Sequence, residues 1–187
     1  MIKKILALVA VIFLCAANIG YAEKAPDVIY NLAGGEIAAL GTDSVIVDAI
    51  KEANSKNQTL DSIKLLDEQW QITPGLDAFM KSFMENACAA KIKSFKDSKP
   101  FYSEIFVMDN QGAIVAMTDK TSDYWQGDEA KFKKSYNKGN GAVFVDNVEF
   151  DDSTQVYLVQ VSVPVKVDGR TIGVITVGID VDVLSEK

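Results

Sequence analysis

Residues 154–180 constrain the fold most, because they have the pattern of two long strands joined by a minimal turn. Valine recurs at every second position from 159 to 165, and Ile175, Val177 and Ile179 repeat the alternation after the turn. A period of two places these side chains on one face of a sheet. Asp168-Gly169 between the two runs is typical of a two-residue hairpin. We therefore predict antiparallel strands over Thr154–Val167 and Arg170–Asp180.

The rest of the chain predicts three more strands and a helical N-terminal half. Strands are expected at Tyr102–Met108, Ile114–Met117 and Ala142–Glu149. Helices are expected from Pro26 to about Asn57, over a short segment after Thr59, from Thr73-Pro74 to Lys99, and over Asp128–Tyr136. Helices followed by a mainly antiparallel sheet of about five strands define an α+β fold, with the long helices packed on the valine face.

Residues 1–22 have the pattern of a secretory signal peptide. Lys3 and Lys4 precede an unbroken apolar run from Ile5 to Leu14, and small residues follow near Ala22. This pattern predicts export and cleavage, which leaves residues 23–187 as a single domain in the periplasm or outside the cell. The alternative is that the apolar run stays uncleaved as a membrane anchor.

Composition excludes several classes of function. The chain has no histidine, and Cys88 is its only cysteine after the predicted signal peptide. Serine–histidine and cysteine–histidine catalysis and conventional zinc or copper sites are thereby excluded, so we expect no cofactor, no metal and no enzymatic activity. The net charge is −7 and Arg170 is the only arginine, so the chain is not expected to bind nucleic acid.

The segment Thr118–Tyr136 interrupts the predicted sheet with a polar and aromatic loop. It carries Asp123, Tyr124 and Trp125, followed by Asp128. Two amphipathic rings beside carboxylates, held between strands, suit the wall of a small-molecule pocket. The alternative is that the two rings plug one end of the core. The lysines that follow, at 131, 133 and 134, are interpreted as a solvated helix face.

The second face of the last two strands is polar and small, with Gln160, Ser162, Thr176 and Gly178. Apolar residues also lie on it, namely Val156, Leu158 and Val174, which are not expected on a face fully open to water. We therefore favour a cavity over this face. The alternative is that the face simply meets solvent, as in many antiparallel sheets.

Three stretches together resemble the Cache (also called PDC) family, the extracytoplasmic PAS-like sensor domains of bacterial receptors. They are YSEIFVMDNQGAIVAMTDKTSDYWQGDEAKF, AVFVDNV and VYLVQVSVPVKVDGRTIGVITVGIDVDVL, and the SVPV…DG…IGV…VGID ending is the most specific part. With the N-terminal helices, the resemblance spans nearly all of residues 23–187. It implies a single sheet with a helix layer on one side and a ligand pocket on the other, closed by the loop and short helix after the second strand.

The resemblance also implies ligand-binding positions. Tyr124 and Trp125 resemble the pocket aromatics of the family, and Asp146 resembles an acidic residue that accepts a ligand amine in amino-acid-binding members; Asp180 is a second candidate for that role. The candidate ligand-binding residues are Tyr124, Trp125, Asp123, Asp128, Asp146, Tyr157 and Asp180.

The amino-acid-binding members also have an arginine just before these aromatics, to hold the ligand carboxylate. This chain has Thr121, Ser122 and Asp123 there. We therefore favour an amine-bearing or neutral polar ligand, bound by ion pairing and cation–π contact. A small carboxylate held by backbone donors and Tyr or Thr hydroxyls is the alternative.

The leading functional hypothesis is an exported sensor module that binds a small polar ligand and relays the bound state to a separate partner, such as a membrane receptor or another signalling protein. Receptors of the family continue into a transmembrane helix, whereas this chain ends seven residues after Asp180, so the partner is expected to be a separate protein. The second hypothesis is a non-catalytic structural or adaptor protein with an empty Cache-like fold. A homodimer through the N-terminal helices is expected by resemblance only.

Overall fold

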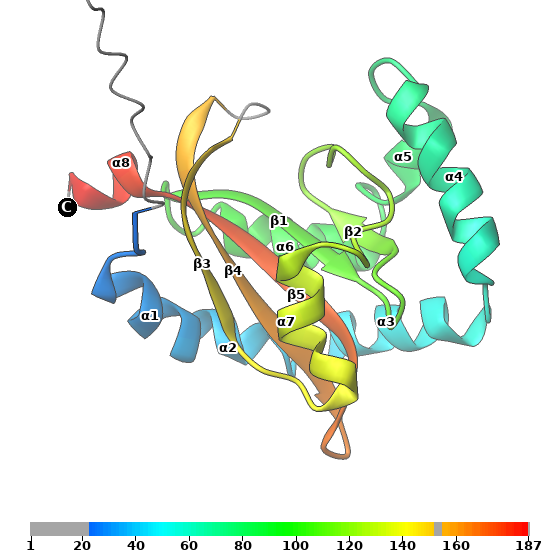
Figure 1. The fold of residues 1–187 in the computed structure, drawn as a ribbon, viewed down its shortest axis with the longest axis horizontal. Coiled ribbons are helices and arrows are strands. Elements are labelled where there is room, and N and C mark those ends of the chain that lie inside the picture. Colours follow the sequence, from blue (N-terminus) through cyan, green and yellow to red (C-terminus); the bar gives the residue numbers. More distant parts are fainter. Residues whose placement is uncertain (1–22, 152–154, 187) are drawn as a thin grey trace, which may run out of the picture.

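The computed structural model describes residues 23–151 and 155–186, so the predicted signal peptide lies outside the described residues. At its centre is a five-stranded sheet of β1 (Tyr102–Met108), β2 (Ile114–Met117), β3 (Phe144–Asp151), β4 (Val156–Val167) and β5 (Arg170–Asp180). The order is β2-β1-β5-β4-β3, and every neighbouring pair is antiparallel (Figure 1). The predicted α+β fold is confirmed.

The β4–β5 hairpin turns where the sequence predicts. Asp168 and Gly169 have φ angles of 49° and 79°, the left-handed backbone that a two-residue hairpin favours. In the register that follows, Val159 lies opposite Ile179, Val161 opposite Val177 and Val163 opposite Ile175. The apolar sets of the two strands therefore share one face.

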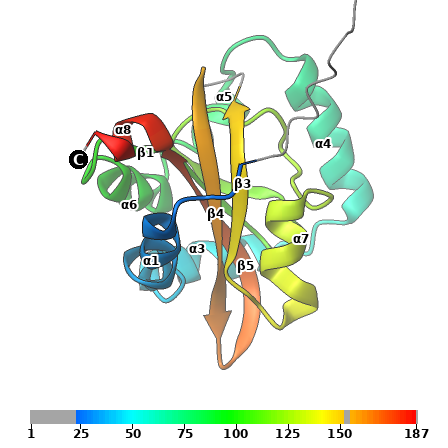
Figure 2. The ribbon, with the colours of Figure 1, turned by 60° about the vertical axis from the view of Figure 1, so that its left-hand side comes forward.

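This apolar face packs against helices of the N-terminal half. These are α1 (Asp27–Gly34), α2 (Glu36–Leu40), α3 (Ser44–Ser55) and α6 (Ala87–Lys96). Figure 2 shows α1 and α6 on one side of the strands and α7 on the other. Isoleucines 29, 37, 46, 50 and 92 of these helices are completely buried. The predicted packing of helices on the valine face is confirmed.

A second, smaller core lies on the opposite face, towards β1 and β2. Phe106 and Met108 of β1 meet Trp70 of α4 (Leu60–Ile72), Met80 of α5 (Ala78–Ser82) and Phe132 of α7 (Ala130–Tyr136) in one cluster. Helices α4 and α5 stand beside the β2 edge of the sheet, whereas α7 lies over β4 and β5 (Figure 1). The two faces are thus covered by different parts of the chain.

The predicted helices are divided more finely than their periodicity indicates. The region from Pro26 to Asn57 forms α1, α2 and α3, and the region from Thr73 to Lys99 forms α5 and α6. The prediction that the latter helix begins at Pro74 is wrong. Asp77 caps α5 by accepting a bond from the Met80 amide, and Asn86 caps α6 by accepting one from the Ala89 amide. Each cap satisfies amides that a helix start leaves unpaired, so each begins a new helix.

Several boundaries in the C-terminal half also differ. Helix α7 begins at Ala130 instead of residue 128, and β3 begins at Phe144 instead of residue 142. Thr154, the predicted start of β4, lies outside the described residues. A short 3₁₀ turn, η1 (Asn137–Gly139), follows α7, and a helix that was not predicted, α8 (Val181–Ser185), follows β5 directly.

Candidate ligand-binding site

A cavity of about 370 Å³ lies on the polar face of the sheet, between the N-terminal end of α7 and strands β3 and β4; we call it the α7 cavity. Strand β4 contributes Leu158 and Gln160 to its wall, β3 contributes Asp146 and Glu149, and α7 contributes Lys131. A cavity is thus present over one end of that face, as predicted, whereas Ser162 and Thr176 further along it are completely buried and do not line the cavity.

A buried carboxylate beside this cavity orients one of its wall residues. Glu104 of β1 is 7% exposed, and its Oε1 accepts a hydrogen bond of 2.9 Å from Nε2 of Gln160. Because the amide nitrogen is held by Glu104, the amide carbonyl is the group of Gln160 that is left for the cavity. The wall therefore presents an acceptor suited to a ligand N–H group.

Carboxylates outnumber cations among the residues that line the α7 cavity. Glu129, Asp146, Glu149 and Asp151 line it together with a single lysine, Lys131. The Nζ of Lys131 is 3.0 Å from Oε2 of Glu129, and the lysine side chain is only 14% exposed. The interpretation of Lys131 as part of a solvated helix face is therefore wrong.

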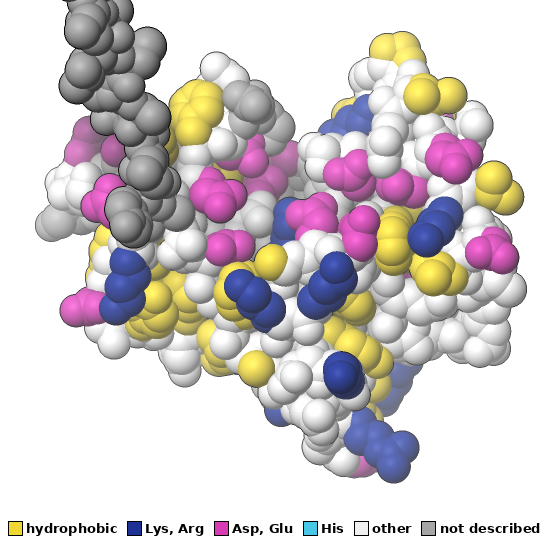
Figure 3. Space-filling view, in the orientation of Figure 1, with side chains coloured by type: hydrophobic (Ala, Val, Ile, Leu, Met, Phe, Trp, Pro, Cys, Tyr) yellow, Lys and Arg dark blue, Asp and Glu magenta, His cyan; other side chains and the backbone are white. Residues whose placement is uncertain are grey.

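The surface around this cavity is acidic as well. Figure 3 shows Asp and Glu side chains gathered around the hollowed upper part of the face that carries α7. Clefts lined by one sign of charge raise the local concentration of the opposite charge. The electrostatics of this face therefore favour a cationic ligand over an anionic one.

The seven predicted ligand-binding residues do not meet in one place. Asp146 lines the α7 cavity, whereas Asp123, Trp125 and Asp128 line a neighbouring cavity of about 370 Å³ against α4. Glu129 lines both. In the neighbouring cavity the Nζ of Lys64 lies 4.8 Å from the Trp125 ring centroid, and Nε1 of Trp125 donates to the carbonyl of Gln111.

The remaining three residues have other surroundings. Tyr124 is 4% exposed, and its ring packs among those of Trp70, Phe79 and Phe83 at centroid distances of 5.6–5.7 Å, as the plug alternative expects. Tyr157 is half exposed beside Phe150. The carboxylate of Asp180 caps α8 by accepting bonds from the amides of residues 182 and 183.

Strand alternation does not indicate Glu104 as a site residue, but a glycine in a neighbouring strand does mark its position. Gly178 of β5 lies opposite both Glu104 and Gln160 in the sheet. A Cβ at Gly178 would lie 2.6 Å from Cγ of Glu104. A glycine inside a strand often marks a close approach of this kind. Here its missing side chain leaves the space in which the Glu104–Gln160 pair lies.

The cavity-bearing part of the chain matches a known family. Residues 77–186 match the model described as methyl-accepting chemotaxis protein-like, first PDC sensor domain. The chain belongs to this PDC family. The matched region runs from the cap of α5 to α8 and so contains the whole sheet, α7 and the α7 cavity. PDC domains of this family are the sensor domains of receptors and are not catalytic.

Solved structures give weaker likenesses. The sensor domain of the histidine kinase DctB of V. cholerae is 13% identical, with a TM-score of 0.45 over 86% of this chain and 52% of that one. The ligand-binding domain of the Campylobacter jejuni chemoreceptor Tlp3, in complex with 4-methylisoleucine, is 18% identical, with a TM-score of 0.43 over 84% of this chain and 62% of that one. The chain thus spans roughly half the length of such domains. A comparison with curated proteins gave no match.

Two further properties of this PDC chain concern membranes and metals. Among residues 23–151 and 155–186, no helix combines the length and the apolar composition needed to cross a bilayer. Within the same ranges, no group of three or more acidic or cysteine side chains is arranged to hold a metal ion.

We expect the stability of the unliganded protein to depend on pH through Glu104. Burial raises the pKa of this carboxyl above its ordinary value of 4.5, although the hydrogen bond from Gln160 acts in the opposite direction. The folded state therefore binds this proton more tightly than the unfolded state, and the stability that it contributes is lost as pH rises above 4.5. In thermal unfolding, Glu104→Gln should melt above the wild type by a margin that grows from pH 4 to pH 8. A margin that does not change with pH would contradict this prediction.

Proposed function

We propose that this chain is an exported sensor module whose α7 cavity binds a small amine-bearing or neutral polar molecule. The observation that carries the proposal is the charge of the cavity: four carboxylates line it, and its one lysine is already paired with Glu129. An ammonium group would find Asp146 and the Gln160 carbonyl as acceptors. Hydrogen bonds to ionised groups of this kind are about twice as strong as neutral ones.

A small carboxylate fits the same cavity less well. Its carboxylate would have to displace Glu129 from Lys131 and would be repelled by the other carboxylates of the cavity. The free energy lost when the carboxylate gives up its hydration would therefore be offset only slightly. Amino acids combine both groups. For them, the ammonium would be accepted by Asp146, and the carboxylate could pair with Lys131 only by displacing Glu129 from it.

The bound state would be read through α7. This helix packs on β4 and β5, and β5 continues directly into α8. Closure of the α7 segment over a ligand would therefore be transmitted through β5 to the position of α8. Loops that close on ligand binding act in this way in other proteins. A separate partner, a membrane receptor or another signalling protein, would receive this change.

Two further parts of the proposal concern assembly and location. Pairing of two copies through the N-terminal helices is supported by Val28 and Tyr30 of α1, whose side chains are 46% and 41% exposed. Location in the periplasm or outside the cell is supported by the signal-peptide pattern of residues 1–22.

The test is a thermal-shift and calorimetric screen of residues 23–187 with small amines, amino acids and carboxylates. We expect amines to raise the melting temperature. Asp146→Asn should weaken the best amine about 10- to 100-fold, because it removes an ionic hydrogen bond worth roughly 1.5–3 kcal/mol. Asp61→Asn, which removes an exposed carboxylate on α4, is the matched control and should change nothing. Binding of carboxylates but not amines would contradict the proposal, and a panel without any binder would favour the adaptor hypothesis.

A further inference from the structure

Another cavity is separate from the α7 cavity. It has a volume of about 620 Å³ and lies between α3, the α5–α6 segment and β2. None of the residues that line it lines the α7 cavity. Its volume is within the range of about 300–1,000 Å³ that is usual for small-molecule sites. We call it the α3 cavity.

One end of the α3 cavity is aromatic. Phe79, Phe83 and Tyr124 line it, with ring centroids 4.9–5.6 Å apart and planes inclined by 45–88°. Phe79 remains 39% exposed although it belongs to this cluster. Aromatic rings prefer offset or edge-to-face neighbours. A ring placed in the cavity would complete the cluster and cover the exposed part of Phe79.

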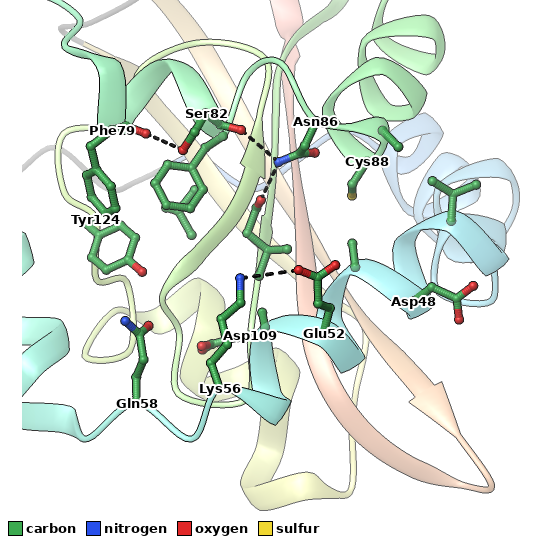
Figure 4. A pocket seen from close by; sticks show the side chains of 17 residues that line it. Asp48, Glu52, Lys56, Gln58, Phe79, Ser82, Asn86, Cys88, Asp109 and Tyr124 are labelled. Carbon is green, nitrogen blue, oxygen red and sulfur yellow. Dashed lines mark hydrogen bonds and ion pairs between the residues drawn. The ribbon is translucent and has the colours of Figure 1, made fainter.

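The hydroxyl of Tyr124 points into this cavity without a partner. Figure 4 shows it directed into the space between the aromatic end and α3. Tyr124 is 4% exposed, and no described residue makes a hydrogen bond with its hydroxyl. Burial and the nearby charge of Asp109 raise the pKa of Tyr124 to about 12, so the hydroxyl keeps its proton and can donate. Among the described residues, the buried side-chain atoms without a partner do not include this hydroxyl, so its oxygen is accessible from the cavity.

The rest of the wall restricts the charge of an occupant. The wall beside the ring cluster is apolar, with Ala49, Ala53, Ile114 and Val115. Asp48 and Glu52 of α3, and Lys56 just after its end, lie exposed at the opening. Lys56 pairs with Glu52. A carboxylate would meet the acids of the opening and Asp109. An ammonium group could donate a hydrogen bond to the Tyr124 hydroxyl oxygen, but it would lose its hydration beside the apolar side chains.

We propose that the α3 cavity is a second ligand site, for an uncharged aromatic molecule that carries one hydroxyl or carbonyl oxygen. The ring of the ligand packs against Phe79 and Phe83, and its oxygen accepts a hydrogen bond from the Tyr124 hydroxyl. This site goes beyond the proposed function of the α7 cavity, because it takes a different class of ligand and uses none of the same residues.

The test uses p-cresol as the probe and isothermal titration calorimetry of residues 23–187. We expect a dissociation constant of about 10 µM to 1 mM, as is usual for a ligand of this size. Benzoate and benzylamine, which add a negative or a positive charge, should each bind at least about tenfold more weakly.

Two variants locate the binding. Tyr124→Phe keeps the ring and removes the hydroxyl, and should weaken p-cresol about 3- to 10-fold, the effect of one neutral hydrogen bond. Ala53→Leu places a larger side chain in the cavity and should weaken binding at least about tenfold, whereas Ala90→Leu, at an exposed position of α6, is the matched control and should have no effect. If Ala53→Leu fails to fold, Tyr124→Phe still decides the question.

Asp146→Asn should leave p-cresol binding unchanged, which separates this site from the α7 cavity. Failure of p-cresol to bind the wild type would overturn the proposal. Wild-type affinity in both Tyr124→Phe and Ala53→Leu would do the same, as would equal binding of benzylamine. A p-cresol site that responds to these variants would stand even if no amine binds the α7 cavity.

Discussion

Replacing Trp70 by alanine should lower the free energy of unfolding by about 3–5 kcal/mol, the usual cost of removing a buried aromatic side chain. Trp70 is 1% exposed and packs against the rings of Phe79, Phe83 and Tyr124. Its Nε1 donates a hydrogen bond of 2.8 Å to the carbonyl of Thr121. The substitution removes this packing and leaves the carbonyl of Thr121 without that donor.

The measurement is urea unfolding, with Ile72→Ala as the control. Ile72 lies on the same helix but is 73% exposed, so its replacement should change stability by less than about 0.5 kcal/mol. Trp70→Phe should fall between the two, because it keeps a ring but loses the hydrogen bond. Equal stabilities for Trp70→Ala and Ile72→Ala would show that α4 is not packed on the segment that carries Thr121 and Tyr124.

Replacing Gly173 by alanine should cost about 1–3 kcal/mol, because it overpacks the main core. A Cβ at Gly173 would lie 2.3 Å from the carbonyl oxygen of Met108 and 2.9 Å from two side-chain atoms of Ile50. The first contact is with backbone in the neighbouring strand, so it cannot be relieved by a rotamer change. Strand β5 would have to move away from β1, or α3 away from the sheet.

Gly34→Ala is the matched control for this experiment. Gly34 lies in α1, and a Cβ there would have no heavy atom within 4 Å. Alanine is favoured over glycine in a helix by about 1 kcal/mol, so this variant should be as stable as the wild type or more stable. If the two variants unfold at the same urea concentration, the close contact of β5 with α3 and β1 is not present in solution.

Much of the fold could be predicted because its signals are local. The alternation that puts Val159, Val161 and Val163 on one face is a property of extended backbone, and Asp168-Gly169 needs only its own φ angles to form the turn. The cap at Asp43 is equally local, since its side chain reaches the amides of Val45 and Ile46. The breaks at Asp77 and Asn86 were missed because apolar residues continue at helical spacing through both of them.

The candidate site could be predicted only in part. Asp146 was expected to accept a ligand amine from the family resemblance; it lines the α7 cavity, and its role in binding stays a prediction. Tyr124 and Trp125 were expected to act together, yet they line different cavities. The backbone is extended at this point, where Trp125 forms a β-bridge with Ala113, so consecutive side chains point in opposite directions. Their adjacency in the sequence therefore suggested a shared pocket, whereas the extended backbone directs the two rings into different cavities.

The sequence by itself determined the strands, their faces, the hairpin between β4 and β5, and the absence of histidine chemistry, because each depends on neighbouring residues or on composition. Only the tertiary structure decided where the hollows lie and which groups face them. Glu104 and Gln160 are 56 residues apart, and their pairing depends on the β1–β5–β4 order and on the space left by Gly178. A cavity is the space that packed elements leave unfilled, so it depends on the relative positions of distant elements, which no local pattern records.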